Sequence, residues 1–154
     1  MIPQWKQRYN EAHYSKTLRT APNFVRDGHY TQPTLPKYKT ANGLTKLICN
    51  FLNWSGSNAT RISSAGRYIE AKNSQGHKIA CGGQYIPSTT RKGTSDITAT
   101  IKGRSVKIEI KIGKDKASEY QLREQERERA AGGYYEFIST PEQFFELYDK
   151  IINL

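Results

Sequence analysis

Residues 96–102 have the sequence DITATIK and residues 105–112 have the sequence SVKIEIKI, and these two stretches decide the fold. Every second residue in both is apolar, which is the pattern of a β-strand with one buried face. Only Gly103 and Arg104 separate them, so we expect a two-residue hairpin turn there. This register pairs Asp96 with Lys111, and it places the polar side chains on one face and the apolar side chains on the other.

Two acidic residues lie on the polar face of this predicted hairpin. The register makes Asp96 and Glu109 diagonal neighbours, with Cβ atoms about 7 Å apart or less. Two such carboxylates can share one ion, and hard oxygen ligands suit Mg²⁺ or Mn²⁺. Lys111 can then stabilise charge on a bound phosphate. The alternative is an ordinary half-exposed hairpin, whose charges alternate with apolar residues because one face is wet.

The hairpin lies between segments with helical patterns. Residues 43–54 carry apolar side chains at helical spacing, at Leu44, Leu47, Ile48, Phe51 and Leu52. After the hairpin, residues 118–131 form a charged helical pattern that begins with a Ser-x-x-Gln capping box and ends at Gly132-Gly133. A short strand over 134–138 and a helix that begins at Thr140-Pro141 follow. We therefore predict an α/β chain with the order helix, strands, helix, strand, helix.

The segment between the first helix and the hairpin is less regular. Residues 58–92 are rich in Gly, Ser, Thr and basic groups, and we expect loops with one small hairpin built from strand-like pieces at 67–71 and 78–81. Within it, Arg61 and Arg67 are equally consistent with phosphate contacts and with solvated surface charge.

Residues 1–42 differ from the rest of the chain in composition. They contain seven cations, two acids and four prolines, with no sustained hydrophobic period, so we predict a basic N-terminal arm before a domain at 43–154. One interpretation is a nucleic-acid strap whose tyrosines stack on bases, and the other is an extension that packs on its own domain. The tyrosines in question are Tyr9, Tyr14, Tyr30 and Tyr38.

The net charge of +10 favours a polyanionic partner, with DNA as the default. No membrane-length apolar run or secretory signal is present, so we expect a cytoplasmic protein without membrane contact, in the host cytoplasm if the chain is viral. Cys49 and Cys81 are too few for a disulfide scaffold, and each is expected to be structural. His13, His29 and His77 form no recognisable acid-base pair.

The order of the short motifs around the hairpin suggests a family. The sequence GTSD at residues 93–96 is followed after about a dozen residues by IEIK at 108–111 and then by GKDKASEYQ at 113–121. This run resembles the PD-(D/E)XK nuclease superfamily, most closely its VRR-NUC type, which includes stand-alone phage nucleases and is similar to Holliday-junction resolvases. The resemblance extends over about residues 43–140.

The resemblance implies a restriction-endonuclease-like α/β core, a mixed sheet flanked by helices in the order α-β-β-β-α-β-α. It also implies a Mg²⁺- or Mn²⁺-dependent DNA endonuclease, with branched or structured DNA as a candidate substrate. It makes Asp96 and Glu109 metal ligands together with the Ile110 carbonyl, Lys111 the catalytic lysine, and Gln121 a residue that faces the site. The capping box offers Gln121 a second role that does not exclude the first. The basic residues expected to bind nucleic acid are Arg61, Arg67, Arg91, Lys92, Lys114 and Lys116.

The sequence departs from the family pattern in one respect. Many members carry an acid on the first helix, whereas residues 43–54 contain only Asn50 and Asn53 as candidates, which makes a second metal doubtful. Glu70 is a candidate to replace the missing first-helix acid, and the alternative is that it is a surface glutamate. The alternative function is therefore a non-catalytic nucleic-acid-binding protein that retains the nuclease fold. The resemblance also suggests a homodimer, which no feature of the sequence itself establishes.

Overall fold

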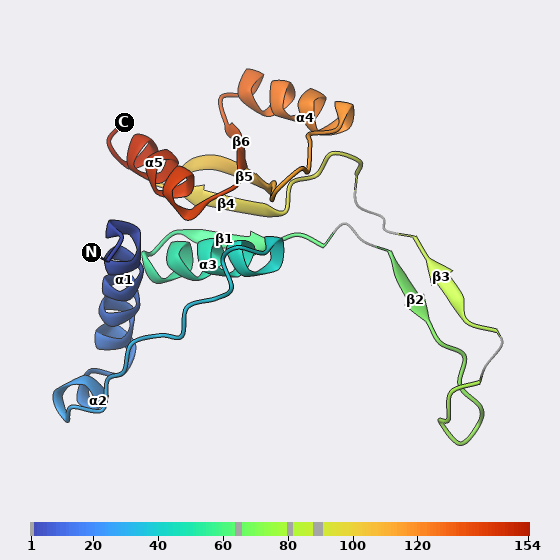
Figure 1. Ribbon diagram of the computed structural model, residues 1–154, viewed down its shortest axis with the longest axis horizontal. Coiled ribbons are helices and arrows are strands. Elements are labelled where there is room, and N and C mark those ends of the chain that lie inside the picture. Colours follow the sequence, from blue (N-terminus) through green and yellow to red (C-terminus); the bar gives the residue numbers. More distant parts are fainter. Residues whose placement is uncertain (1, 64–65, 80–81, 88–90) are drawn as a thin grey trace.

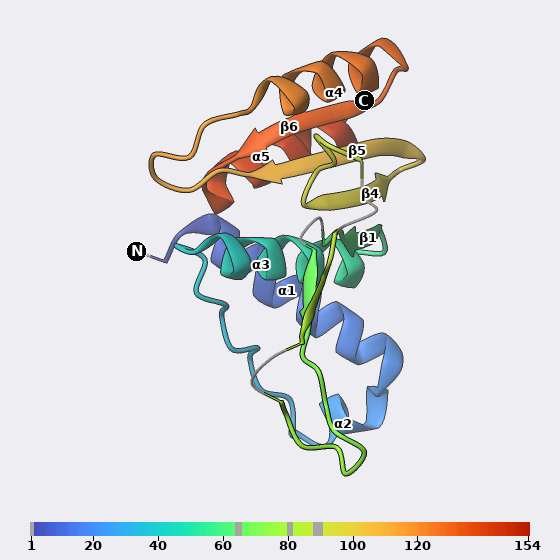
Figure 2. The same cartoon turned by 90° about the vertical axis from the view of Figure 1, so that its right-hand side faces the viewer.

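The computed structural model describes residues 2–63, 66–79, 82–87 and 91–154. A four-stranded mixed sheet forms its centre, with strands β1 (Asn58–Arg61), β4 (Ile97–Ile101), β5 (Arg104–Ile110) and β6 (Tyr134–Ile138). The strands lie in the order β1-β4-β5-β6, where β1, β4 and β5 are antiparallel neighbours and β6 is parallel to β5. Figure 2 shows this order from bottom to top. The α/β prediction with a mixed sheet is confirmed.

The predicted register of the central hairpin is wrong by two residues. β4 pairs with β5 through Ile97–Ile108 and Thr100–Ser105, so Lys102 and Gly103 form the turn in place of Gly103 and Arg104. Both turn residues have positive φ, 47° for Lys102 and 78° for Gly103, as a type I′ turn requires. A shift of two residues preserves which side chains share a face. The division into one polar and one apolar face is therefore correct.

Three helices flank this sheet. α3 (Ala41–Trp54) is capped by the Thr40 hydroxyl, α4 (Glu119–Ala130) begins with the complete Ser118 capping box, and α5 (Pro141–Ile152) has Thr140 as N-cap and proline in its first turn. These helices, and β6, lie where the sequence predicts them. α4 and α5 lie on opposite sides of β6 (Figure 1).

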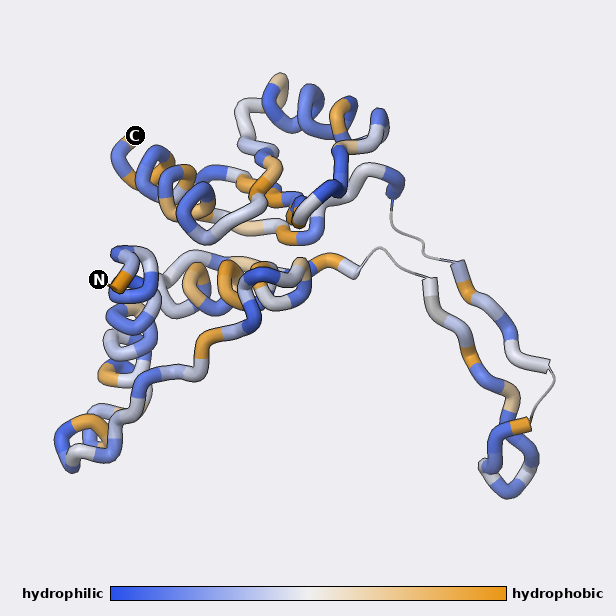
Figure 3. The backbone as a smooth tube through the Cα atoms, in the orientation of Figure 1, coloured by the Kyte–Doolittle hydropathy of each residue, from blue (hydrophilic) through white to orange (hydrophobic). Residues whose placement is uncertain are grey.

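The two faces of the sheet are covered in different ways. The apolar face packs with α3 and α5 around a core that includes Ile97, Ile108 and Phe144. The other face is polar and lies under α4, which is hydrophilic along most of its length (Figure 3) and has no buried residue. Lys107 on this face forms ion pairs with Glu124 and Glu128 of α4, at 3.4 and 2.8 Å. Polar contacts therefore attach α4 to the sheet.

The N-terminal residues contribute to the hydrophobic core. α1 (Gln4–Thr20) packs against α3, with α2 (Pro22–Arg26) after it, and Trp5 and Tyr9 of α1 belong to the central hydrophobic cluster. The Trp5 indole donates to Glu142 of α5 at 2.6 Å. Of the two interpretations of residues 1–42, packing on the chain's own domain is the one that α1 shows. Two aromatic side chains one turn apart, Trp5 and Tyr9, bury one side of α1 although it has no long apolar stripe.

A second, two-stranded sheet extends from the body between β1 and β4 (Figure 1). It consists of β2 (Arg67–Ile69) and β3 (Gln84–Ile86), extended by a bridge between Lys72 and Lys78. The small hairpin was predicted, although its second strand lies later than residues 78–81, and β1 was assigned to loops. Cys81 falls outside the described residues. No helix in the described part of the chain is long and apolar enough to span a membrane.

Candidate active site

The end of the central hairpin places the two predicted metal ligands side by side. The ladder between β4 and β5 ends at the pair Ile97–Ile108, so Asp96 lies just before β4 and Glu109 lies one residue beyond Ile108 on β5. The backbone N–H of Ile110 donates to Asp96 Oδ2 at 3.0 Å, which fixes that carboxylate beside the end of β5. The two carboxylates are close enough for the charge of Asp96 to act on Glu109.

The Glu109 carboxylate is buried and only partly satisfied. The residue is 6% exposed, and its Oε1 accepts a hydrogen bond from Gln121 and lies 3.4 Å from Lys111 Nζ. Its buried Oε2 has no hydrogen-bond partner among the described residues. Burial raises the pKa of Glu109, the nearby Asp96 charge raises it further, and Lys111 opposes both effects. Burying a carboxylate oxygen without a hydrogen-bond partner lowers the stability of the fold unless a cation or a proton binds to it.

Gln121 completes the predicted capping box and also contacts Glu109. Its Oε1 accepts from the backbone N–H of Ser118 at 2.9 Å, which completes the capping box of α4. Its Nε2 donates to Glu109 Oε1. The same side-chain amide therefore holds the start of α4 against the end of β5. Lys111 is similarly shared, because its Nζ also lies 3.3 Å from Asp115 Oδ2.

Two further residues position the loop that carries Asp96. Gly93 has φ +87°, and a Cβ there would overlap the backbone carbonyl of Tyr120 at the start of α4. The hydroxyl of the buried Tyr135 donates to the Gly93 carbonyl at 3.0 Å. Burial, followed by the charges of Glu109 and Asp96, raises the pKa of Tyr135, so this hydroxyl keeps its proton. Gly93 begins the GTSD run and was detectable in the sequence, whereas nothing local distinguishes Tyr135.

A pocket of about 300 Å³ opens beside Glu109. Gln121 and Gly93 line it, and Arg91 and Lys92 supply positive charge at the same place. The Lys92 ammonium lies 5.1 Å from the centre of the Tyr120 ring, and the Arg91 guanidinium is 3.9 Å from Glu124. Two cations next to a buried carboxylate form a surface suited to a phosphate that is shared with a metal ion.

The other predicted nucleic-acid contacts are not gathered at this pocket. Arg61 pairs with Ile97, so it points to the α3 side of the sheet, where it donates to Asn42 at 2.5 Å. Lys114 and Lys116 are exposed in the loop before α4, and Arg67 belongs to β2.

The remaining candidates have structural surroundings. Glu70 is exposed on the projecting hairpin and pairs with Lys78, so it does not substitute for a first-helix acid. Asn50 donates to the Tyr9 hydroxyl. The Asn53 side chain donates to the carbonyl of Ala59 and accepts from the backbone N–H of the same residue. Cys49 packs partly buried against the core, as expected for a structural thiol, and burial raises its pKa.

Comparison with protein-family models finds no match, and comparison with curated proteins finds no similar chain. The chemistry of the site is therefore argued from its geometry. In the described residues, no three His, Cys, Asp or Glu side chains gather around one point. The protein ligands that this site offers are two carboxylates and backbone carbonyls. Such a set fits Mg²⁺ or Mn²⁺, which retain several waters and bind substrate phosphate oxygens, better than it fits zinc.

Proposed function

We propose that the chain is a metal-dependent nuclease that hydrolyses DNA phosphodiester bonds. Asp96, Glu109 and the Ile110 carbonyl are the proposed metal ligands, and Lys111 and Gln121 act beside them. The single observation that carries the proposal is the buried Oε2 of Glu109, which has no partner among the described residues and lies beside a second carboxylate. A divalent cation satisfies both charges at once.

The side chains around the carboxylates have distinct proposed roles. When bound, Mg²⁺ or Mn²⁺ lowers the pKa of a water ligand and offsets charge on the scissile phosphate. The Lys111 ammonium, 11% exposed and 3.4 Å from Glu109, stabilises negative charge that develops on that phosphate. Gln121 holds Glu109 in place through Oε1 and leaves Oε2 available. Arg91 and Lys92 bind an adjacent phosphate of the DNA strand.

The arrangement of elements also supports a nuclease core. Without the projecting hairpin, the chain from α3 onward runs α3-β1-β4-β5-α4-β6-α5. This is the order that the PD-(D/E)XK resemblance implies, and the GTSD and IEIK motifs lie at adjacent strand ends. The contact between Asp96 and the Ile110 backbone supports the ligand set that the resemblance implies.

The test is cleavage of closed circular, linear, single-stranded and four-way-junction DNA with Mg²⁺, Mn²⁺ or EDTA. Lys111→Ala should abolish metal-dependent cutting. The matched control is Lys107→Ala. It removes the same charge from the same face of the sheet, four residues earlier in the chain, where Lys107 pairs with Glu124 and Glu128. Cutting of the circular DNA identifies an endonuclease. Equal cutting by wild type and Lys111→Ala contradicts the proposal.

A second candidate function is nucleic-acid binding without catalysis. It is favoured by the absence of acidic residues from α3 and, in the described part of the chain, by the absence of a third His, Cys, Asp or Glu side chain that could share a metal with Asp96 and Glu109. This function predicts binding that weakens steeply with salt and no cutting of any substrate with either metal. A homodimer, as suggested by the resemblance, is tested by sizing chromatography with light scattering.

A further inference from the structure

The projecting β2–β3 hairpin carries a second binding surface. We infer that it binds a single-stranded stretch of nucleic acid, with the rings of Tyr68 and Tyr85 stacking on unpaired bases. The inference rests on the proposed function for the identity of the polymer, because it extends the path of the same DNA strand beyond the metal site. Four observations support it.

The two tyrosines form an exposed aromatic pair. Tyr68 and Tyr85 are directly opposite each other in the hairpin and are 62% and 60% exposed. Each ring lies over a glycine of the other strand, since a Cβ at Gly83 would overlap the Tyr68 ring and a Cβ at Gly66 would overlap the Tyr85 ring. One side of each ring is thus supported by backbone and the other faces solvent. Base stacking needs flat, pre-ordered π surfaces of this kind.

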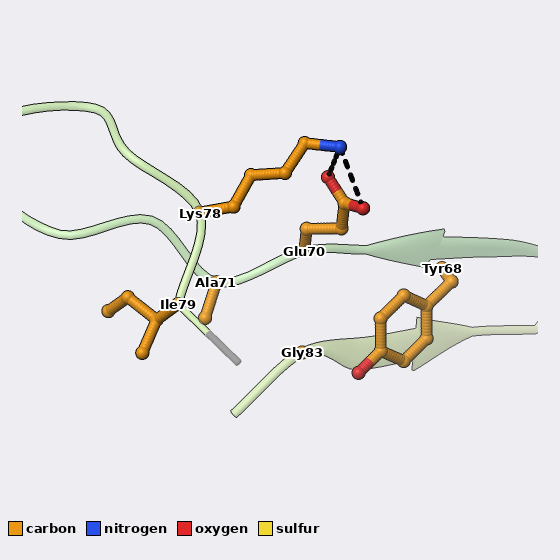
Figure 4. Close-up of a pocket in the computed structure, with 6 residues that line it drawn as sticks. All are labelled: Tyr68, Glu70, Ala71, Lys78, Ile79 and Gly83. Atoms are coloured by element: carbon orange, nitrogen blue, oxygen red, sulfur yellow. Dashed lines mark hydrogen bonds and ion pairs between the residues drawn. The ribbon is translucent and has the colours of Figure 1, made fainter. Parts of the chain in front are cut away.

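A pocket of about 400 Å³ adjoins this pair (Figure 4). The Tyr68 ring forms one wall, and Ala71 and Ile79 supply apolar surface. Lys78 lies at the same pocket, where its Nζ is 2.8 Å from Glu70. An aromatic wall with apolar surroundings and a cation beside it matches the chemistry of a nucleobase and its phosphate.

The charge of the segment matches a polyanion. Residues 66–87 contain three cations, Arg67, Lys72 and Lys78, and one acid, Glu70, so the hairpin segment carries a net charge of +2. Arg61, Arg91 and Lys92 add positive charge where this segment joins the body. The same charge argues against a second copy of the chain as the occupant, because two hairpins packed together would bring two basic segments into contact. Nucleic acid is the partner that such a segment attracts.

The hairpin is attached directly to the candidate active site. The backbone N–H of Ile62, just after β1, donates to the carbonyl of Asp96 at 2.8 Å. Tyr68 is six residues beyond Ile62 in the chain, a reach of about 20–22 Å at most. The returning chain passes Arg91 and Lys92 at the pocket beside Glu109. A strand held at the metal site can therefore continue to the tyrosines.

The test measures binding of a fluorescent 20-nucleotide oligo-dT by anisotropy in EDTA, where metal-dependent cleavage cannot occur. The variant is the double substitution Tyr68→Leu with Tyr85→Leu, which keeps apolar volume but removes the π surfaces. Its Kd should rise about tenfold or more. The slope of log Kd against log salt should stay unchanged, because no phosphate contact is removed. Duplex DNA of equal length should show a smaller effect.

Two controls separate stacking from other effects. Tyr68→Phe with Tyr85→Phe keeps both rings and should bind within about twofold of wild type. Phe24→Leu removes an exposed aromatic ring from α2 and should also have no effect. Unchanged binding by the double Leu variant overturns the inference, as does equal loss in the Phe variant. A wild-type dimer that the double Leu substitution dissociates also overturns it, in favour of a second copy as the occupant.

The outcome is separable from that of the proposed function. If Lys111→Ala cuts DNA as wild type does, the nuclease proposal fails while the binding result for the hairpin stands. If the double Leu variant binds oligo-dT normally and wild type shows metal-dependent cutting that Lys111→Ala lacks, the hairpin inference alone fails. Circular dichroism and thermal unfolding of each variant establish that the compared proteins are folded.

Discussion

The side chain of Gln121 joins the capping box of α4 to the carboxylate of Glu109. Its Oε1 accepts from the Ser118 backbone, and its Nε2 donates to Glu109 Oε1. A residue that stabilises a helix end in this way also holds one oxygen of Glu109, while the other oxygen, Oε2, is buried without a hydrogen-bond partner among the described residues. Helix initiation and preparation of the candidate metal site thus depend on one amide group.

The two roles of Gln121 can be separated by substitution. Gln121→Ala should lower cutting about tenfold or more, as the loss of residues that orient metal ligands does. Ser118→Ala removes the N-cap hydroxyl and should lower stability by about 1 kcal/mol while Gln121 still contacts Glu109. We therefore expect Ser118→Ala to lose stability in thermal unfolding and to keep most of its activity. Equal losses of activity in both variants would mean that Gln121 acts only through the helix.

Glu109 should reduce the stability of the metal-free protein. Burial and Asp96 raise its pKa above 4.5, so the folded state holds this proton more tightly than the unfolded state. The protonated group therefore contributes to the free energy of unfolding at low pH. This contribution is lost as the pH rises through the raised pKa, and it is absent at neutral pH. Glu109→Gln should raise the melting temperature at pH 7 by a few degrees. Mn²⁺ should raise the melting temperature of wild type but not of Glu109→Gln.

The same pKa shift sets the pH dependence of cleavage. A protonated Glu109 cannot bind a cation, so cutting should fall on acidification at a pH above the ordinary value of 4.5. Higher Mn²⁺ concentration competes with the proton, and the midpoint should move to lower pH as the metal is increased. Single-turnover rates measured against pH at two Mn²⁺ concentrations provide the check. A midpoint that does not respond to the metal would place the titrating group elsewhere.

Gly93 should be more sensitive to substitution than other glycines with positive φ. In Gly93→Ala, the new methyl group meets backbone strain and the Tyr120 carbonyl together. Gly132 has a similar φ of +83° but open space around it, so Gly132→Ala is the matched control. It should lower the unfolding free energy by about 1 kcal/mol through backbone strain alone. We expect Gly93→Ala to unfold at lower temperature than Gly132→Ala and to lose cutting, because the loop before Asp96 must move. Similar stability and activity in both variants would exclude this role.

The packing of α1 predicts that the N-terminal segment stabilises the whole domain. Trp5→Ala should lower the unfolding free energy by about 3–5 kcal/mol, since Trp5 is buried in the core and bonded to Glu142. Tyr14→Ala on the exposed side of α1 should lower it by less than about 1 kcal/mol. Chemical denaturation measures both values. A small effect of Trp5→Ala would mean that α1 is a separable appendage.

Local patterns were sufficient for most of the elements. Each of these elements is indicated by residues that are neighbours in the chain. The indications are the apolar period of α3, the cap and terminal glycines of α4, the proline at the start of α5 and the alternation in β4 and β5. The register of the hairpin was predicted incorrectly because turns at Gly103-Arg104 and Lys102-Gly103 give the same division of faces. β1 was not recognised because it has four residues and only Ala59 is buried.

By itself, the sequence determined that an α/β sheet has one polar face carrying Asp96, Glu109 and Lys111, because alternation along a strand fixes which side chains share a face. Only the tertiary structure decided that the Ile110 backbone holds Asp96, that Gln121 holds Glu109 and Tyr135 holds Gly93, and that Tyr9 is buried while Tyr68 and Tyr85 are exposed. These relationships join residues far apart in the chain. They depend on how strands and helices pack, which no local pattern encodes.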